Sequence, residues 1–285
     1  MTSVAILGTG SLGKAIAQRY LNEGVTVQTW NRTRERLRLL LELGAIELSN
    51  LFEVTAKCQV VITVLRDGPV TAKVVRELGS LQNTTLIPMG TMGVSESKNL
   101  AKQVIKQGGS YLEAPVLGSK PQALSGNLLV MAGGDVTIFE QHYQLLNYLC
   151  KRPKLVGPVG CGAATKLALN QLIASLTHSF SLSLRLIQQA GVSVETFMEI
   201  LRPSALYAPT FDKKLERMLH RHYADPNFST SLLRKDMTLF LQETAVNGLE
   251  DLGLKGLVQL LNQAKGTELD AQDYCALHEL TKVSE

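Results

Sequence analysis

A glycine-rich turn between a strand and a helix constrains the fold of this chain more than any other feature. The apolar run over residues 4–7 predicts a buried strand, and residues 11–21 carry apolar side chains at helical spacing. The turn between them reads Gly8-Thr-Gly-Ser-Leu-Gly13, which is the GxGxxG pattern. A strand, this turn and a helix in succession predict the start of a dinucleotide-binding domain of the Rossmann type.

Each glycine of the pattern has a mechanical role. Gly8 allows the tight turn, Gly10 allows the backbone to approach a pyrophosphate, and Gly13 allows the helix to pack closely on the strand. The start of the helix, at Ser11 and Leu12, offers backbone N–H groups and a partial positive charge to the phosphates. We therefore expect these five residues to bind a dinucleotide cofactor. The alternative is a glycine-rich turn of the same fold that binds no ligand.

The rest of the first half alternates short apolar runs with amphipathic segments. The expected strands lie at residues 25–30, 45–48, 60–64, 84–87, 110–112, 128–132 and 154–156. The expected helices lie at residues 33–43, 70–78, 95–107 and 136–149. This alternation predicts an α/β fold with a doubly wound parallel sheet that helices cover on both faces.

The second half has a different character. A helical pattern runs over residues 163–189 and closes before Gly191, and no strand-like alternation follows it. Pro203, Pro209 and Pro226 divide the remainder, because proline removes a backbone donor and tends to end a helix. We therefore expect two domains, a cofactor-binding domain over residues 1–160 and an all-helical domain over residues 161–285.

The segment after the second strand indicates which cofactor is bound. About 20 residues beyond the glycine-rich turn, NAD-binding domains usually carry an acidic residue that binds the ribose 2′-hydroxyl. This chain has Asn31-Arg32-Thr33 there. Without a carboxylate to repel it, a 2′-phosphate can accept hydrogen bonds from Asn31 and Thr33 and pair with the Arg32 guanidinium. The sequence therefore favours NADPH over NADH.

Composition argues against several functional classes. The 285 residues suggest two domains at about 150 residues per domain. A net charge of +4, spread along the chain, argues against nucleic-acid binding. No apolar run approaches the roughly 20 residues of a membrane helix, and the four scattered cysteines lack the spacing of a zinc site. We expect a soluble cytoplasmic protein with reduced thiols, no metal centre and no membrane partner.

Four stretches of the sequence form a pattern when they are taken together. They are the opening turn with Asn31-Arg32-Thr33, the segment Glu113-Ala-Pro-Val-Leu-Gly-Ser119, the segment Gly160-Cys-Gly-Ala-Ala-Thr-Lys-Leu-Ala-Leu-Asn170, and Lys235-Asp236. In this order and at these spacings they resemble the β-hydroxyacid dehydrogenase family, whose catalytic pattern is G-x-G-x-x-x-K-x-x-x-N. That family includes 3-hydroxyisobutyrate dehydrogenases and the glyoxylate and succinic semialdehyde reductases.

The resemblance implies a Rossmann-type domain followed by a helical domain built on a long interdomain helix. It makes Lys166 and Asn170 the catalytic residues. Their spacing of four residues places both side chains on one helix face. An ammonium there can stabilise the negative charge that grows on a carbonyl oxygen during hydride addition, and can donate the proton. Without the resemblance, both residues would be expected on a solvated face.

The resemblance implies further cofactor contacts. Lys235 is expected near the nicotinamide and the substrate, the alternative being a surface ion pair with Asp236. Thr91 corresponds to a family threonine that approaches the cofactor ribose, although the residues before it lack the usual Asp and Ser. Leu65 follows the most hydrophobic strand and is expected at the edge where strand ends face a dinucleotide.

The expected substrate contacts are Leu117, Gly118, Ser119, Lys166 and Asn170. Leu117 stands where family members usually carry a serine whose hydroxyl helps to hold the substrate carboxylate. The Gly118 and Ser119 N–H groups, the Ser119 hydroxyl and a cation such as Lys235 remain for that purpose. Because leucine supplies no hydrogen bond and excludes water, we expect succinic semialdehyde or a similar four-carbon acid to be preferred to glyoxylate.

The predicted function is the NADPH-dependent interconversion of a small aldehydo or keto acid and its hydroxyacid, with Lys166 as general acid and base. One alternative is an imine reductase, which Lys166 disfavours because related imine reductases generally replace that lysine. Another is a catalytically silent NADP-binding regulatory protein, which the presence of both Lys166 and Asn170 disfavours. The expected partners are a small carboxylic acid and further copies of the chain, in a homodimer or homotetramer.

Overall fold

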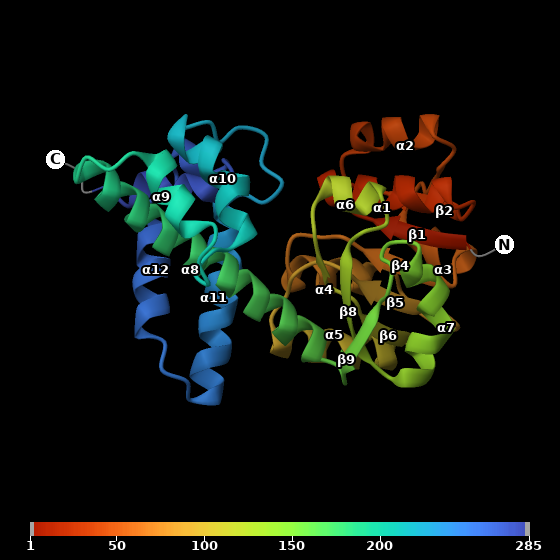
Figure 1. Ribbon diagram of the computed structural model, residues 1–285. Coiled ribbons are helices and arrows are strands. Elements are labelled where there is room, and N and C mark those ends of the chain that lie inside the picture. Colours follow the sequence, from red (N-terminus) through yellow and green to blue (C-terminus); the bar gives the residue numbers. More distant parts are fainter. Residues whose placement is uncertain (1–2, 283–285) are drawn as a thin grey trace. The chain divides into compact units, whose positions relative to one another are not determined.

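Short apolar strands in the first half of the chain form one sheet (Figure 1). The computed structural model describes residues 3–282. Within them nine strands form the sheet, in the order β3-β2-β1-β4-β5-β6-β8-β7 with β9 beside β8. The strands are β1 (Ser3–Leu7), β2 (Thr26–Trp30), β3 (Ile46–Glu47), β4 (Val60–Thr63), β5 (Thr85–Pro88), β6 (Ser110–Glu113), β7 (Val116–Leu117), β8 (Leu129–Gly134) and β9 (Lys154–Gly157). The strand order from β3 to β6 is that of a Rossmann-type sheet.

The first six strands run parallel, as the sequence predicts, but the far edge of the sheet does not. β8 pairs antiparallel with both β6 and β7, and β9 pairs parallel with β8. Only residues 118–128 separate β7 from β8. A crossover that keeps two strands parallel needs about a dozen residues or more, so the chain turns back instead.

Helices cover both faces of the sheet because successive strand residues point to opposite sides. Val4 and Ile6 of β1 pack with residues of α1 and α7, whereas Ala5 and Leu7 pack with residues of α4 and α5. All four of these side chains are fully buried, which explains why the strand is a continuous apolar run. The helices of this part are α1 (Ser11–Asn22), η1 (Arg34–Leu37), α2 (Arg38–Glu42), η2 (Leu51–Glu53), α3 (Val54–Lys57), α4 (Gly68–Glu77), α5 (Val94–Lys106), α6 (Lys120–Leu124) and α7 (Val136–Asn147).

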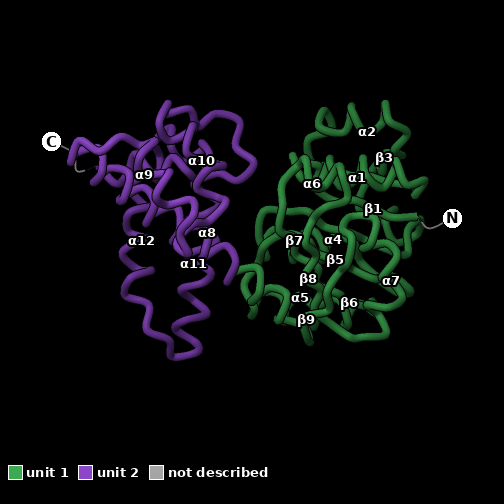
Figure 2. Tube along the Cα trace, viewed as in Figure 1, with its two compact units in different colours: residues 1–167 green, residues 168–285 purple. Residues whose placement is uncertain are grey.

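The chain forms two compact units that divide between Leu167 and Ala168 (Figure 2). The sequence placed the domain boundary between residues 160 and 161, at the start of the long helix α8 (Cys161–Gln189). The first turn of α8 is bonded to the first unit. The buried Glu113 carboxylate accepts hydrogen bonds from the Gly162 and Ala163 N–H groups at 2.7 and 3.3 Å. The two units therefore divide inside the helix.

The second unit contains only helices and their connections within its described residues. Besides the remainder of α8, its helices are α9 (Val194–Leu201), α10 (Pro209–Leu219), α11 (Thr230–Asn247), α12 (Leu252–Asn262), η3 (Glu268–Asp270), η4 (Tyr274–Ala276) and α13 (Leu277–Leu280). Pro209 begins α10, where a missing N–H costs nothing, and Pro203 and Pro226 lie between helices. The Phe180 ring stacks on the Phe211 ring with 4.5 Å between centroids, so α8 and α10 share one apolar core.

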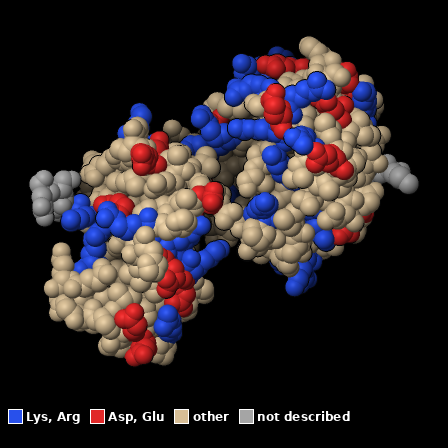
Figure 3. Space-filling model, turned by 90° about the horizontal axis from the view of Figure 1, so that it is seen from above, with Lys and Arg blue, Asp and Glu red and all other residues tan. Residues whose placement is uncertain are grey.

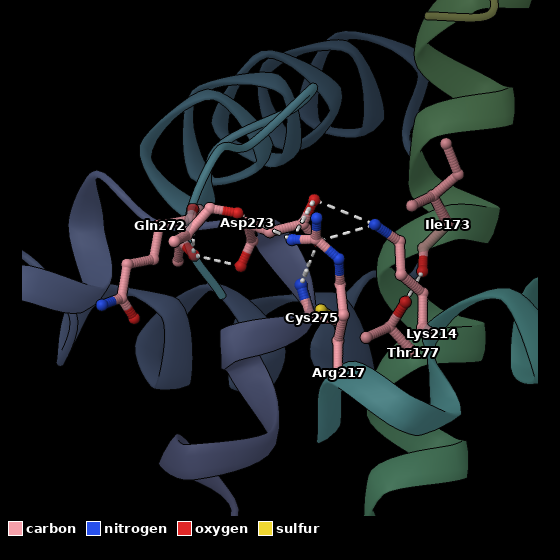
Figure 4. A network of polar contacts seen from close by, with 9 residues as sticks. Ile173, Thr177, Lys214, Arg217, Gln272, Asp273 and Cys275 are labelled. Atoms are coloured by element: carbon pink, nitrogen blue, oxygen red, sulfur yellow. Dashed lines mark hydrogen bonds and ion pairs between the residues drawn. The ribbon is translucent and has the colours of Figure 1, made fainter. Parts of the chain in front are cut away.

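A buried ion pair holds the last turns of the second unit against α10 (Figure 4). Lys214 Nζ lies 2.8 and 2.9 Å from the two carboxylate oxygens of Asp273 and 4.4 Å from the ring centroid of Tyr274. The Arg217 guanidinium lies 3.9 Å from the same carboxylate, to which the Cys275 N–H donates at 3.2 Å. Removing one partner of such a buried pair costs about 3–5 kcal/mol, so this cluster fixes residues 273–275 on α10.

Charged side chains of both signs share the surface. Figure 3 shows Lys and Arg side chains among Asp and Glu side chains on both units. Pairs within one turn of helix, such as Arg38 with Glu42 and Lys57 with Glu53, contribute to this mixture. Within residues 3–282, every helix is too short or too polar to cross a lipid bilayer.

Candidate active site

The glycine-rich turn lies at the point where the strand order of the sheet reverses. Gly8 has a φ of +97°, and a Cβ there would lie 2.5 Å from the carbonyl oxygen of Val64, after β4. A Cβ on Gly13 would lie 2.0 Å from the Gly8 oxygen. Only glycine fits at these two positions, because a side chain at either would collide with backbone. Gly10 differs, since a Cβ there would meet no atom within 4 Å.

The open space beside Gly10 lies next to the first residues of α1. Gly10 is the N-cap residue of that helix and supplies no side-chain hydrogen bond to it, and the first turn contains no acidic residue. At α4, in contrast, the Asp67 carboxylate accepts from the Val70 N–H at 2.9 Å. The first N–H groups of a helix need an acceptor, and phosphate is a suitable one. The turn and the helix start therefore fit a dinucleotide pyrophosphate.

The segment after β2 is tied to the glycine-rich turn by Asn31. Its amide nitrogen donates to the Thr9 hydroxyl at 2.7 Å, and its amide oxygen accepts from the Thr33 N–H at 2.9 Å. Asn31 therefore orients the loop, a role that its position in the sequence did not reveal. The Arg32 side chain is exposed and forms no ion pair with any described residue, whereas Arg34 forms a two-fold ion pair with Glu47 at 2.7 and 2.9 Å.

The loops after β4 and β5 come to the same edge of the sheet as Gly8. A Cβ on Gly8 would lie 2.7 Å from Leu65 Cδ2, and a Cβ on Gly90 would lie 2.3 Å from the Leu65 carbonyl oxygen. Thr91 follows Gly90 directly and is half-buried. The structure thus brings the loops of Leu65 and Thr91 beside the glycine-rich turn.

The predicted substrate segment already has an internal hydrogen-bond acceptor. Gln122 Oε1 accepts from the Ser119 N–H at 3.0 Å and from the Ser119 hydroxyl at 2.6 Å. The sequence analysis expected the Ser119 N–H and hydroxyl to bind a substrate carboxylate. In the structure both of these donors already bond Gln122 of α6. Leu117 is half-buried on β7, opposite Leu129 of β8, and Gly118 is exposed with a φ of +132°.

Lys166 and Asn170 both lie on α8, four residues apart, and both are buried. Their exposed fractions are 9% and 1%. The Asn170 amide nitrogen donates to Asp236 Oδ2 on α11 at 2.6 Å, and Lys235 Nζ lies 2.7 Å from the other oxygen of that carboxylate. The pair of Lys235 and Asp236 thus lies beside Asn170, and the Asp236 carboxylate is 1% exposed rather than on the surface.

The residue that sequence reasoning missed is Glu113, the last residue of β6. Its side chain is 2% exposed, and Oε1 accepts from the Gly160 and Gly162 N–H groups at 2.8 and 2.7 Å. The feature of the sequence that could have indicated this role is that an acidic residue ends an apolar strand and begins the expected substrate segment. Its contact with the start of α8 joins residues 47 to 50 positions apart in the chain, and no local pattern reveals such a pairing.

The described residues contain no cluster of side chains suited to bind a metal ion. Within residues 3–282, no three His, Cys, Asp or Glu side chains come together in a way that could hold a metal ion. The four cysteines are free, and Cys58, Cys150 and Cys275 are buried. Burial raises the pKa of each of these three thiols, which keeps them protonated.

The fold and the glycine-rich site define a dinucleotide-binding protein of the Rossmann type. Residues 3–160 match the family described as the NAD binding domain of 6-phosphogluconate dehydrogenase. Residues 160–281 match the family described as the NAD-binding domain of NADP-dependent 3-hydroxyisobutyrate dehydrogenase. The chain belongs to the β-hydroxyacid dehydrogenase family, as its sequence motifs predict.

Relatives of known activity are similar over the whole chain. Glyoxylate/succinic semialdehyde reductase 1 of Arabidopsis thaliana is 32% identical over 99% of this chain and 99% of its own. The chloroplastic reductase 2 of the same plant is 30% identical over 99% of this chain and 80% of its own. The 3-hydroxyisobutyrate dehydrogenase of Mycobacterium tuberculosis, solved with L-serine, has a TM-score of 0.89 at 20% identity, covering 99% of this chain and all of that one. This last likeness confirms the fold.

Proposed function

We propose that this protein is an NADPH-dependent reductase of small aldehydo or keto acids, reversible as a hydroxyacid dehydrogenase, in which Lys166 is the general acid and base. The observation that carries the proposal is the burial of Lys166 and Asn170 on one face of α8, at 9% and 1% exposure. A lysine without a function on a helix is normally solvated. A lysine and an amide on one helix face and away from water suit a reaction in which charge develops on oxygen.

In the proposed reaction, side chains of the protein transfer the proton, and the cofactor transfers the hydride. A bound nicotinamide dinucleotide supplies or accepts the hydride. The Lys166 ammonium stabilises the negative charge on the carbonyl oxygen and donates its proton to that oxygen. In the direction of oxidation, neutral Lys166 accepts the hydroxyl proton. Asn170 is held through its amide nitrogen by Asp236, which leaves its amide oxygen to accept from the ammonium or from a substrate hydroxyl.

The proposed cofactor site combines the glycine-rich turn with the loops beside it. The exposed Arg32, which precedes Thr33 in the chain, supports NADPH as the cofactor, since residues 31–33 contain no carboxylate that would repel a 2′-phosphate. Asn31 supports this site by holding Thr9 and the Thr33 N–H in place. The cofactor-binding residues that we propose are Gly8, Gly10, Ser11, Leu12, Gly13, Asn31, Arg32, Thr33, Leu65, Thr91 and Lys235.

The substrate that we propose is a four-carbon aldehydo acid, succinic semialdehyde, in preference to glyoxylate. The two plant relatives are named as reductases of both compounds. Leu117 offers no hydrogen bond to a carboxylate, and the Ser119 donors already bond Gln122. A small, strongly hydrated acid loses hydrogen bonds to water when it binds there, and this segment offers few hydrogen bonds to replace them. We propose Leu117, Gly118, Ser119, Lys166 and Asn170 as the substrate contacts.

We propose further that the protein is a cytoplasmic homodimer or homotetramer. The exposed apolar side chains Leu172, Leu182 and Leu186 on α8 support association, since they are 52%, 47% and 67% exposed. The four free cysteines are typical of a reducing compartment. Light scattering of the purified protein tests the oligomer, and a single species at the mass of one chain contradicts it.

A substrate panel tests the proposed activity. The purified protein is assayed with succinic semialdehyde, glyoxylate, methylmalonate semialdehyde and a cyclic imine, each with NADPH and with NADH. We expect the highest kcat/KM with succinic semialdehyde and NADPH. Turnover of the cyclic imine alone identifies an imine reductase. Tight NADPH binding without turnover of any compound identifies a regulatory protein.

A further inference from the structure

One buried carboxylate fixes the start of the helix that carries Lys166. Glu113 Oε1 accepts three backbone hydrogen bonds, from the N–H groups of Gly162 at 2.7 Å, Gly160 at 2.8 Å and Ala163 at 3.3 Å. The side chain comes from the end of β6 and is 2% exposed. The first N–H groups of a helix have no acceptor within the helix, and a negative charge there is favoured by the helix dipole. Glu113 supplies both the acceptor and the charge.

The surrounding residues leave room for this contact. A Cβ on Gly133 would lie 2.3 Å from Glu113 Oε1, and a Cβ on Gly162 would lie 3.0 Å from the same atom. Gly160 has a φ of +104°, which turns its N–H toward the carboxylate in a conformation that other residues rarely adopt. Gly133 and Gly162 thus leave space for one carboxylate oxygen, and the backbone conformation of Gly160 suits its N–H bond to that oxygen.

The second carboxylate oxygen is held from the opposite side. The Ser97 hydroxyl of α5 donates to Glu113 Oε2, and the same hydroxyl lies 2.7 Å from the Tyr111 hydroxyl. Burial raises the pKa of Tyr111, so its hydroxyl stays neutral and can donate. Glu113 is therefore fixed by α5 and β6 at one end and holds α8 at the other, all within the first unit.

We propose that Glu113 is a positioning residue for Lys166. Lys166 lies one turn beyond Gly162 along α8, so the place of the first turn determines where the ammonium is held. A catalytic group displaced by about 1 Å can lose about 100-fold in rate. This inference rests on the proposed role of Lys166 and adds to it the carboxylate that fixes the helix.

Three variants separate positioning from general stabilisation. Glu113→Ala removes the acceptor of all three N–H groups, and we expect kcat to fall about 10- to 100-fold with the Kd for NADPH little changed. Glu113→Gln keeps an acceptor oxygen and should retain kcat within about threefold. Asp135→Ala is the matched control, because it removes the carboxylate that caps α7 in the same unit, where it accepts from the Thr137 and Ile138 N–H groups, and it does not touch the N–H groups of α8. It should lower Tm and leave kcat close to wild type.

A double-mutant cycle between Glu113 and Lys166 tests whether Glu113 acts through Lys166, with kcat measured under chemistry-limited conditions with succinic semialdehyde and NADPH. If Glu113 acts through Lys166, adding Glu113→Ala to Lys166→Ala changes kcat by less than about threefold. Equal losses in both backgrounds overturn the positioning role while leaving that of Lys166 intact. A Lys166→Ala protein with full kcat overturns both roles. If the Ala variant does not fold, Glu113→Met takes its place in the cycle, because it fills the same space without an acceptor.

Discussion

The amide nitrogen of Asn170 donates a hydrogen bond of 2.6 Å to Asp236 Oδ2, and both residues are 1% exposed. The bond joins α8 to α11. The second oxygen of Asp236 lies 2.7 Å from Lys235 Nζ, so one buried carboxylate holds two residues of the proposed site. Hydrogen bonds to a charged acceptor are stronger than those between neutral groups. Asp236 therefore determines which way the Asn170 amide faces.

Removing that carboxylate should impair turnover more than cofactor binding. We expect Asp236→Ala to lower kcat by about tenfold or more, the worth of one charge-assisted hydrogen bond. Asp270→Ala is the matched control, because Asp270 pairs with Arg234, the neighbour of Lys235 on α11. Steady-state kinetics and NADPH titration of both variants measure the effect. Equal kcat in Asp236→Ala and Asp270→Ala would show that the bond from Asn170 to Asp236 is not needed for turnover.

Cofactor preference should depend on Arg32. Replacing this exposed guanidinium by Ala should raise the Kd for NADPH about tenfold and leave the Kd for NADH unchanged, because only NADPH carries the 2′-phosphate. Arg38→Ala removes an arginine of the same region that pairs with Glu42, and it should change neither Kd. Fluorescence titration of the wild type and both variants with each cofactor measures these Kd values. A wild-type protein that prefers NADH contradicts this account of the segment.

The first six strands of the sheet could be predicted because they are short, mostly apolar runs, and a long amphipathic helix follows each of β1, β4 and β5. The two-residue strand β7 and the five-residue helix α6 could not, since neither is long enough to show a period. The helix expected over residues 33–43 is divided into η1 and α2, where Arg34 pairs with Glu47 of β3. Tertiary contacts therefore decide the short elements, and periodicity decides the long ones.

Substrate preference should respond to Leu117. Leu117→Ser restores a hydroxyl and should raise kcat/KM for glyoxylate by about fivefold, the worth of one hydrogen bond, with a smaller effect on succinic semialdehyde. Leu129 lies opposite Leu117 in the β7–β8 ladder, so Leu129→Ser makes the same chemical change one strand away. That control should leave both substrates unaffected. Equal responses of the two substrates to Leu117→Ser show that Leu117 does not determine specificity.

Stability should fall in mild acid because of His278. Burial lowers the pKa of this imidazole to about 4, and its Nδ1 has no hydrogen-bond partner among the described residues. The folded protein keeps His278 neutral, whereas the unfolded chain takes up a proton below about pH 6.5. The contribution of the neutral His278 to the free energy of unfolding is fully present above about pH 6.5 and is lost as the pH falls toward 4. At pH 5 the loss is about 2 kcal/mol.

Urea unfolding at pH 7.5 and pH 5 measures this effect. The difference in the free energy of unfolding between the two pH values should shrink in His278→Gln, whatever the stability of that variant at pH 7.5. His220→Gln should keep the wild-type difference, since His220 is exposed beside Glu216. An unchanged difference in His278→Gln assigns the acid sensitivity to other groups.

The candidate site was predictable only in part. The glycine-rich turn, Lys166 and Asn170 stand in local patterns that a sequence displays. The roles of Asn31, which holds Thr9, and of Gln122, which accepts from Ser119, depend on side-chain directions that spacing does not fix. Glu113 depends on a contact between β6 and α8, distant in the chain. Sequence patterns therefore indicate which residues can act, and the fold determines which partners they meet.

The role of Lys166 is tested most directly by the single-turnover rate of NADPH oxidation by Lys166→Ala with succinic semialdehyde. General acid catalysis contributes about 10² to 10⁴ in rate, so the variant should lose that factor in the chemical step. Its Kd for NADPH should stay within about twofold of wild type, because the proposed cofactor site lies at the glycine-rich turn and does not include Lys166. A variant that binds NADPH normally and keeps more than about half of the wild-type rate contradicts the role of Lys166.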